Sequence, residues 1–317
     1  MPSQNPPRAY SGAHFNLELD HDKEVGLFRS IEGGGVKVDV LSYQAGNSFE
    51  AIKQLGKPKF EDFKIQVGMS MSSVFYEWIA EFFRGGCTRK NGAVVAADFY
   101  YNERARREFT NAMITELAFP KLDASDKNAA YMNVTICPEE IKFVKGSGQK
   151  LQFTEANAAQ KLWAACNFAM LLDPKPLERS LLRCTKIEGF TLKQKPIEYH
   201  HGFQRWASKI PGRIEYPNLS FTIPEADAQP LFEHMAKHGV GGAPMPIDEI
   251  NGSISTYDNA NKPLFHLHFF GGRLLNATVD KSDAGSEEFK QVKFEMAIEK
   301  MDFAYEKYEF MKMMEDD

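Results

Sequence analysis

The sequence lacks the short motifs that mark the common enzyme classes. It has no GxSxG nucleophile elbow, no GxxxxGK[ST] phosphate loop and no GxGxxG after an expected strand. The glycines at 33–35 are followed by neither a lysine nor the start of a helix, so we interpret them as a turn that needs a permissive backbone. These absences argue against an enzyme, and we expect no catalytic residue and no cofactor.

Cysteine is scarce, and its spacing suggests no pairing. The chain has four cysteines, which form neither a CxxC pair nor a disulfide framework: Cys87, Cys137, Cys166 and Cys184. No window is a long apolar run that could span a membrane, and the polar residues 1–12 resemble neither a signal peptide nor a transit peptide. We therefore expect synthesis in a reducing cytoplasm, free thiols and no membrane partner.

An excess of positive charge is also missing. Residues 1–150 carry 19 Lys plus Arg and 19 Asp plus Glu, so the whole net charge of −5 lies in residues 151–317. A protein that grips nucleic acid usually presents a basic face to the phosphates. The mildly acidic balance disfavours such binding, although it would suit a conduit through which DNA slides. The compact basic cluster at 104–107 is better explained by a solvated turn or an acidic partner.

Histidines are few, and four of them have spacings that could hold a metal. His234 and His238 are four apart on an expected helix, while His266 and His268 are two apart on an expected strand. A zinc hydrolase using these four residues is therefore one alternative. However, no glutamate follows His234 to act as a base, and we expect no metal site.

What the chain does contain is an internal repeat. Three strings recur in the same order, namely FNLELD at 15–20 as FAMLLD at 168–173, IEG at 31–33 and again at 187–189, and NG at 91–92 and again at 251–252. The offset from Ile31 to Ile187 is 156 residues, and it grows to 160 after extra residues before Asn251. Two long copies predict tandem globular domains. We place a first domain at 1–147, a linker at 148–160 and a second domain at 161–317.

Each copy has the pattern of several strands and one helix. Apolar residues alternate at 15–19, 36–40 and 63–67, which predicts half-buried strands. Val74, Trp78 and Phe82 are spaced four apart, which predicts an amphipathic helix ending at Gly85-Gly86, and the second copy predicts a helix at about 225–238. The predicted fold is therefore mainly β with one helix per domain (α+β): two tandem β-sandwich or barrel domains.

A long connection separates the second and third strands of each copy. These connections, 44–59 and 200–213, both carry apolar side chains that either fold back on their own domain or dock on a neighbour. The candidates for contacts between subunits are Phe49, Ile52, Leu55, Phe203, Trp206 and Ile210.

The order of these motifs resembles the tail tube protein family of contractile phages and related injection systems. The resemblance rests on an opening strand at 15–20, a short turn at 30–33, Tyr43 with Gly46, the long connection with Gly56 and Pro58, and the strand, helix, Asn-Gly turn and final strands at 63–143. The second copy keeps most of these features, but it has Gly271-Gly272 where the first has Asn111-Ala112.

The resemblance implies a structural virion protein. It would be a tail tube subunit that forms stacked rings, in which sheets of neighbouring subunits join and the long connection contacts the next ring. Its partners would be itself and the tail sheath, baseplate and tail terminator proteins, with DNA or an effector passing through the lumen without specific binding. Such a protein would be located in the virion after assembly in the bacterial host cytoplasm.

Two other functions remain open from the sequence. Because the chain carries two copies where a usual tube subunit has one, it could be a baseplate hub or tube initiator, and a ring could contain three or six chains. The alternative of another class is a two-domain β-barrel module that binds a small ligand or a protein.

Overall fold

The fold was analysed in a computed structural model, which describes residues 12, 14–20, 25–47, 49–151, 163–173, 177–242, 244, 250–281 and 289–305. Across these residues the protein is mainly β-structure with few helices, as the sequence predicts. None of the helices in these ranges is long and apolar enough to cross a membrane. Most of the expected linker, 152–160, and the C-terminal methionines lie outside the described residues. The predicted domain boundaries stay a prediction.

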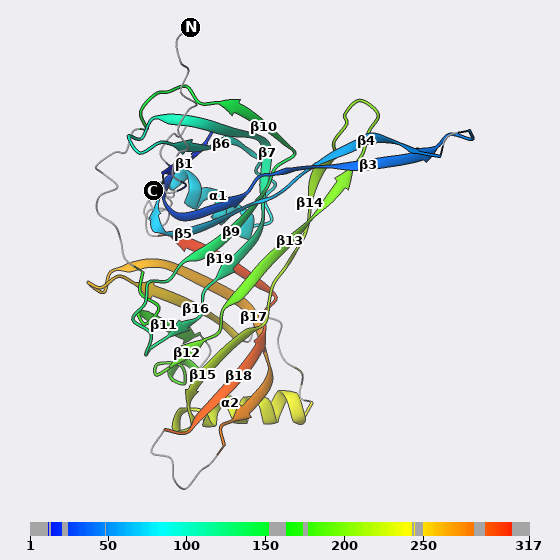
Figure 1. The fold of residues 1–317 in the computed structure, drawn as a ribbon. Helices are drawn as coiled ribbons and strands as arrows, with labels where there is room; N and C mark the ends of the chain where they lie inside the picture. The colour runs from blue at the N-terminus through cyan, green and yellow to red at the C-terminus, as the bar shows by residue number, and fades with distance from the viewer. Residues whose placement is uncertain are drawn as a thin grey trace, which may run out of the picture.

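The first half of the chain forms the upper part of the molecule in Figure 1. Its elements follow the chain in this order: β1 (Phe15–Leu19), β2 (Gly26–Gly33), β3 (Val36–Gln44), β4 (Ala51–Phe60), β5 (Phe63–Met71), α1 (Ser73–Phe83), β6 (Lys90–Ala97), β7 (Glu103–Phe119), β8 (Leu122–Asp123), β9 (Met132–Cys137) and β10 (Glu140–Lys145).

The second half forms most of the lower part (Figure 1). It contains β11 (Phe168–Leu172), η2 (Leu177–Arg179), β12 (Lys186–Ile187), β13 (Phe190–Tyr199), β14 (Ser208–Glu215), β15 (Leu219–Pro224), η3 (Glu225–Asp227), α2 (Gln229–His234), η4 (Met235–Val240), β16 (Ile250–Tyr257), β17 (Pro263–Val279), β18 (Gln291–Ala297) and β19 (Lys300–Tyr305). The helix expected at 225–238 is thus divided among η3, α2 and the π-helix η4.

Strands of both halves share the two large sheets. The first sheet runs β1-β6-β7-β9-β5-β2, and β10 and β13 also pair with β7. The second runs β11-β16-β17-β18-β15-β12-β8, and β19 also pairs with β17. Thus β13 of the second half extends the first sheet, while the short β8 of the first half ends the second. The two halves are joined by backbone hydrogen bonds as well as by the chain.

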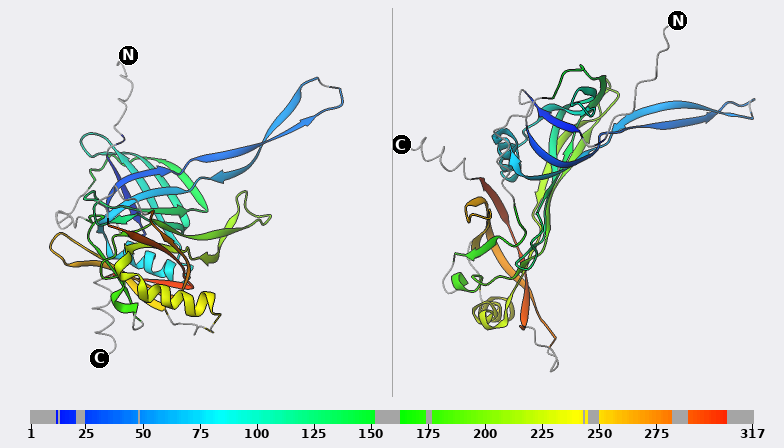
Figure 2. Two further views of the ribbon diagram at one scale, coloured as in Figure 1. Left: turned by 90° about the horizontal axis from the view of Figure 1, so that it is seen from below. Right: turned by 60° about the vertical axis from the view of Figure 1, so that its left-hand side comes forward.

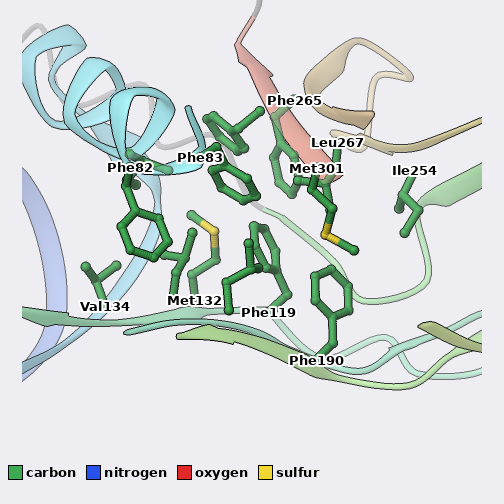
Figure 3. Close-up of a cluster of buried hydrophobic side chains, with 14 of the residues drawn as sticks. Phe82, Phe83, Phe119, Met132, Val134, Phe190, Ile254, Phe265, Leu267 and Met301 are labelled. Atoms are coloured by element: carbon green, nitrogen blue, oxygen red, sulfur yellow. The ribbon is translucent and has the colours of Figure 1, made fainter. Parts of the chain in front are cut away.

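The hydrophobic core is one continuous cluster to which both halves contribute. Figure 3 shows its centre, where the ring of Phe119 lies near Phe83 of α1 and Phe190 of β13. Phe265 lies within 6.0 Å of Phe119, measured between ring centroids, and within 5.3 Å of Phe303. Burying such large rings contributes most of the apolar stabilisation that a sheet fold needs.

Helix α1 is buried on more than one face. The spacing of Val74, Trp78 and Phe82 predicts a single apolar stripe, yet Tyr76 and Phe83 are buried as well. The extra face packs on β19, where Tyr76 stacks on Tyr305 at 3.9 Å between ring centroids. The helix therefore lies between its own sheet and the last strand of the second half.

One expectation about the first half is wrong. Alternation at Val36, Val38 and Val40 predicts a half-buried strand, but every residue of β3 is exposed. The connection 44–59, expected to be a loop, contains most of β4, which pairs with β3. The alternation does mark a strand, but within the chain described here no second layer covers it. The two strands form a separate two-stranded sheet that leaves the body (Figure 2).

Candidate functional site: two exposed hairpin arms

Two β-hairpins project from the same side of the molecule. We call β3–β4 the first arm and β13–β14 the second arm; both are visible at the upper right of Figure 1. The second arm also corrects an expectation, because the connection 200–213 contains much of β14 rather than forming a loop. Tyr199 faces Ser208 across this hairpin, as Gln44 faces Ala51 across the first. The two long connections are therefore hairpins. Their strands bury few side chains, so the sequence lacks the apolar alternation that would predict them.

The base of the first arm is fixed by two glycines. Gly33 and Gly34 have φ values of 87° and 71°, and a Cβ added to Gly33 would lie 2.0 Å from the carbonyl oxygen of Asp62. Only glycine fits such a backbone without strain. The guanidinium of Arg107 donates a hydrogen bond of 2.5 Å to the Gly33 carbonyl. These contacts set the direction in which the arm leaves the body.

Five of the six predicted contact residues are exposed on the arms. Phe49 and Phe203, near the two tips, are 104% and 94% exposed, and Leu55 on β4 is 72% exposed. Ile52 and Ile210 are also among the exposed large hydrophobic residues. Exposed apolar groups that cluster on a projecting element are typical of surfaces that bind another protein. Whether they contact a subunit stays a prediction.

Trp206 differs from the other five. It is half-buried, and its ring lies 6.2 Å from that of Phe60 in an edge-to-face arrangement. Next to it, the guanidinium of Arg205 donates a hydrogen bond of 3.2 Å to the carbonyl of Gly56. These contacts tie the second arm to the first arm of the same chain. Trp206 therefore has a role within the chain, whatever else it contacts.

A cleft of about 910 Å³ lies between the first arm and the tip of the second arm. Its lining mixes aromatic, charged and polar side chains rather than forming an apolar pocket: Phe60, Trp206, Lys59, Glu139, Glu198 and His201 are among them. Small-molecule sites are usually mostly apolar with a few placed polar groups. This cleft is a poor fit to a small ligand, and a better fit to a crevice between two surface elements.

A buried polar cluster anchors the second arm to the first half. The backbone N–H of Lys209 donates to the Glu139 carboxylate at 2.7 Å, and its Nζ donates to the Pro138 carbonyl at 2.9 Å. Arg89 donates to the Lys209 carbonyl at 2.5 Å and pairs with Glu139 at 3.2 Å. Burial raises the pKa of the Cys137 thiol to about 12, against the opposing effect of the Lys209 ammonium, so the thiol stays protonated.

Sequence reasoning missed this cluster, because nothing in the adjacent pair Glu139 and Glu140 marks one of the two carboxylates as buried. Glu139 is 6% exposed. A signal for it existed in the repeat: Lys209 corresponds to Lys53 at the offset of 156, and Glu139 corresponds to Glu299 at the offset of 160. The same residue types thus stand at positions related by the two offsets of the sequence repeat.

The four histidines form two separate pairs. His234 and His238 lie 4.6 Å apart between ring centroids, and His266 and His268 lie 6.3 Å apart. Ser255 lies 2.7 Å from Nδ1 of His266, within hydrogen-bond distance. Within the residues that the structure describes, no three His, Cys, Asp or Glu side chains gather to hold a metal ion.

The basic cluster near residue 104 is paired within the chain. Arg106 forms ion pairs with Glu18, Glu103 and Glu108. Arg104 pairs with Asp98 at 2.6 Å. The charges of Arg104 and Arg106 are thus offset by neighbouring carboxylates, which argues against a basic surface for phosphates.

Comparison with known families identifies the type of protein that the first half resembles. Residues 11–142 match the family described as T4-like virus tail tube protein gp19. This span is less than half of the chain, and it covers the first arm, α1 and the strands around them. The match is to a structural tube protein and not to an enzyme, and it supports a structural tail tube role. No curated protein sequence is significantly similar to the chain.

Solved structures of contractile injection systems are also similar, at low identity. A chain of the PVC sheath–tube complex in the extended state is 16% identical, covers 45% of this chain and 94% of its own length, and gives a TM-score of 0.39. A chain of the anti-feeding prophage cap is 17% identical, covers 46% of this chain and 100% of its own length, and gives a TM-score of 0.40.

Proposed function

We propose that the protein is a tube subunit of a contractile tail or injection system. It assembles with copies of itself into stacked rings around a lumen through which DNA or an effector passes. The family match over residues 11–142 is the observation that carries the proposal. The exposed arms support it, because the apolar side chains of Phe49 and Phe203 do not stabilise a monomer while they are exposed to water, and exposed apolar groups of this kind are typical of protein contacts.

The proposal includes partners on either side of the tube. The sheath would surround the rings, and the baseplate and tail terminator proteins would meet the two ends of the stack. The paired arginines near residue 104 and the net charge of −5 support passage of DNA without specific binding.

A baseplate hub or tube initiator is the second candidate. It is favoured by the size of the chain, since the family match takes less than half of it and the second half has a similar order of elements. We propose that the two halves are tandem copies of one ring-building unit, with three or six chains in a ring. A hub would form a single ring, whereas a tube subunit would stack rings without limit.

Light scattering at several concentrations and negative-stain electron microscopy test the proposal. We expect the purified protein to form rings or tubes, and tubes of many rings distinguish the subunit from the hub. A monomer at every concentration, with no rings on the grid, would contradict both candidates and favour the two-domain binding module.

Replacing the arm-tip residue Phe49 by Ser tests the contribution of the arms. Phe49 is fully exposed, so the thermal unfolding of the subunit should not change. The protein concentration at which rings begin to stack should rise about tenfold or more, because a buried aromatic side chain often dominates an interface. The matched control is Phe99→Ser, which removes an aromatic residue that is 73% exposed on the turn between β6 and β7. Equal effects of the two substitutions would argue against a role of the arm.

A further inference from the structure

The two halves of the chain are joined by a strand ladder that uses one edge of β7. Its pairs are Phe119 with Phe190, Ala118 with Thr191, Leu117 with Leu192, and Glu116 with Lys193. Both strands contribute side chains to the core here, since Leu117 and Leu192 are both 0% exposed. The second arm therefore continues the sheet of the first half.

Strand β17 is the counterpart of β7, and its register repeats that of β7. Leu117 pairs with Val134 on β9, and Ala277 pairs with Phe294 on β18, both at the offset of 160. The ladder of β7 has an irregularity between Ile114 and Glu116, and that of β17 has one between Leu274 and Asn276. The edge of β17 at residues 276–279 thus corresponds to the edge of β7 that β13 occupies.

This edge of β17 has no strand beside it in the described part of the chain. Its side chains are accordingly more exposed: Val279 is 43% exposed, whereas its counterpart Phe119 is 7% exposed. An open edge presents unpaired backbone groups and invites another strand.

Strand β3 is the counterpart of β13 and is equally uncovered. Val36 corresponds to Leu192 at the offset of 156, yet Val36 is exposed where Leu192 is buried. Apart from β4, β3 has no partner strand in the described chain. We call a pairing like that of β7 with β13 a joint. The chain therefore carries one strand of a second joint on β3 and the other on β17.

We propose that β3 of one chain pairs with the β17 edge of the next, in the register of the ladder between β7 and β13. This inference rests on the proposed function and specifies its subunit contact. The partner is a second copy of this chain. The register places Val36 opposite Ala277, Lys37 opposite Asn276, Gly35 opposite Thr278, and Gly34 opposite Val279.

The buried polar cluster supports the same pairing. In the chain, Lys209 of the second arm is held by Glu139 and by the carbonyl of Pro138. The counterparts are Lys53 on the first arm and Glu299 with Ile298 at the β18–β19 turn. Lys53 is exposed, and Glu299 pairs only with Arg273 among the ion pairs of the described residues. The proposed register brings Lys53 of one chain to Glu299 of the next.

The helix contact supports it independently. Helix α1 packs on β19, where Phe303 is 1% exposed. The corresponding pair is α2 and β10, and Phe143 on β10 is 61% exposed. When β3 of the next chain pairs with β17 of this chain, β10 of the next chain packs against α2 of this chain. This contact covers Phe143 of the next chain. The joint thus buries three separate sets of exposed groups.

Such a joint is head-to-tail, because it uses different surfaces on the two chains. A head-to-tail contact closes into a ring when its rotation allows. Every ring built in this way contains an even number of half-chain units, joined alternately within and between chains.

Disulfide trapping tests the register. The double variant Val36→Cys/Ala277→Cys, in a Cys87→Ser background that removes an exposed thiol, should form a ladder of covalent oligomers on mild oxidation, as seen on a non-reducing gel. A mixture of the two single variants should stop at covalent dimers. The matched control Val36→Cys/Thr278→Cys shifts one thiol by one residue to the other face and should not link.

The outcomes separate this inference from the proposed function. If the wild type forms rings but the register pair links no better than the shifted pair, the joint is wrong and the tube function stands. If the wild type stays monomeric, both are overturned. The charge change Lys53→Glu should raise the protein concentration needed for ring formation tenfold or more. The control Lys57→Glu, on the same strand, should leave that concentration unchanged. Equal effects of the two changes would contradict the contact with Glu299.

Discussion

At the scale of the residue, Phe119 connects the two halves most directly. Its ring stacks on Phe190 at 5.0 Å between centroids and contacts Phe83 and Phe265. We expect Phe119→Ala to lower the free energy of unfolding by about 3–5 kcal/mol, because it leaves a cavity among aromatic rings. Urea denaturation measures this loss. The control Phe99→Ala, at an exposed position, should change it by less than about 0.5 kcal/mol. A similar small loss for Phe119→Ala would show that the core can collapse around the gap.

Single residues also mark the limit of sequence reasoning. The sequence leaves open whether Phe49 and Phe203 fold back on their own domain or dock on a neighbour, and their exposure in the structure excludes folding back. The packing of Trp206 on Phe60 does not follow from it, because that contact joins residues far apart in the chain. Burial of Glu139 is equally invisible, since its partner Lys209 lies on a strand of the other half.

At the scale of the element, the turn between β6 and β7 gives a prediction about pH. Partial desolvation would raise the pKa of Asp98, but hydrogen bonds from the Asn102 backbone N–H and from Arg104 outweigh it and lower the pKa to about 2. The unfolded value is about 3.9. The carboxylate therefore stabilises the fold above about pH 4, and this contribution is lost as the pH falls towards 2.

The variant Asp98→Asn measures that contribution. We expect the difference in free energy of unfolding between wild type and variant to be largest near neutral pH and to shrink between about pH 4 and 2. Arg104→Gln should move the loss to higher pH, because it removes one of the hydrogen bonds that favour the charged carboxyl. A difference that does not change with pH would mean that the charge of Asp98 is irrelevant to the turn.

Elements differ in how well the sequence predicts them. Helix α1 begins and ends where its four-residue spacing and its two glycines indicate. Strands β6 and β7 lie within 63–143, where the resemblance places strands, but their burial does not alternate strictly: residues 93–95 of β6 and 112–115 of β7 are buried in succession. The hairpin form of the arms was not predicted, because β4 contains Gly56 and Pro58 and buries no residue.

At the scale of the whole molecule, the shared core predicts a single unfolding transition. Helix α1 lies against β19, and β7 pairs with β13, so neither half can open without exposing the other. Hydrogen exchange with increasing urea should show that protection of residues 73–83 and of residues 300–305 is lost together. Loss of protection at 300–305 well before 73–83 would instead indicate halves that unfold separately.

The overall arrangement was only partly accessible from the sequence. Repetition at offsets of 156 and 160 predicts that the elements recur, and the fold class is as predicted. The exchange of β8 and β13 between the sheets could not be foreseen, because strand pairing over long separations leaves no local pattern.

The ladder between β7 and β13 has a kinetic consequence. Each association between free chains loses translational and rotational freedom, at a cost of about 4–15 kcal/mol. Half of the joints in a ring of this protein would form inside one polypeptide when the chain folds. Closing the ring would therefore need half as many encounters between free chains as a ring of the same number of separate single units. Ring formation would then depend less steeply on protein concentration, and a cell could begin building from a smaller pool of free chains.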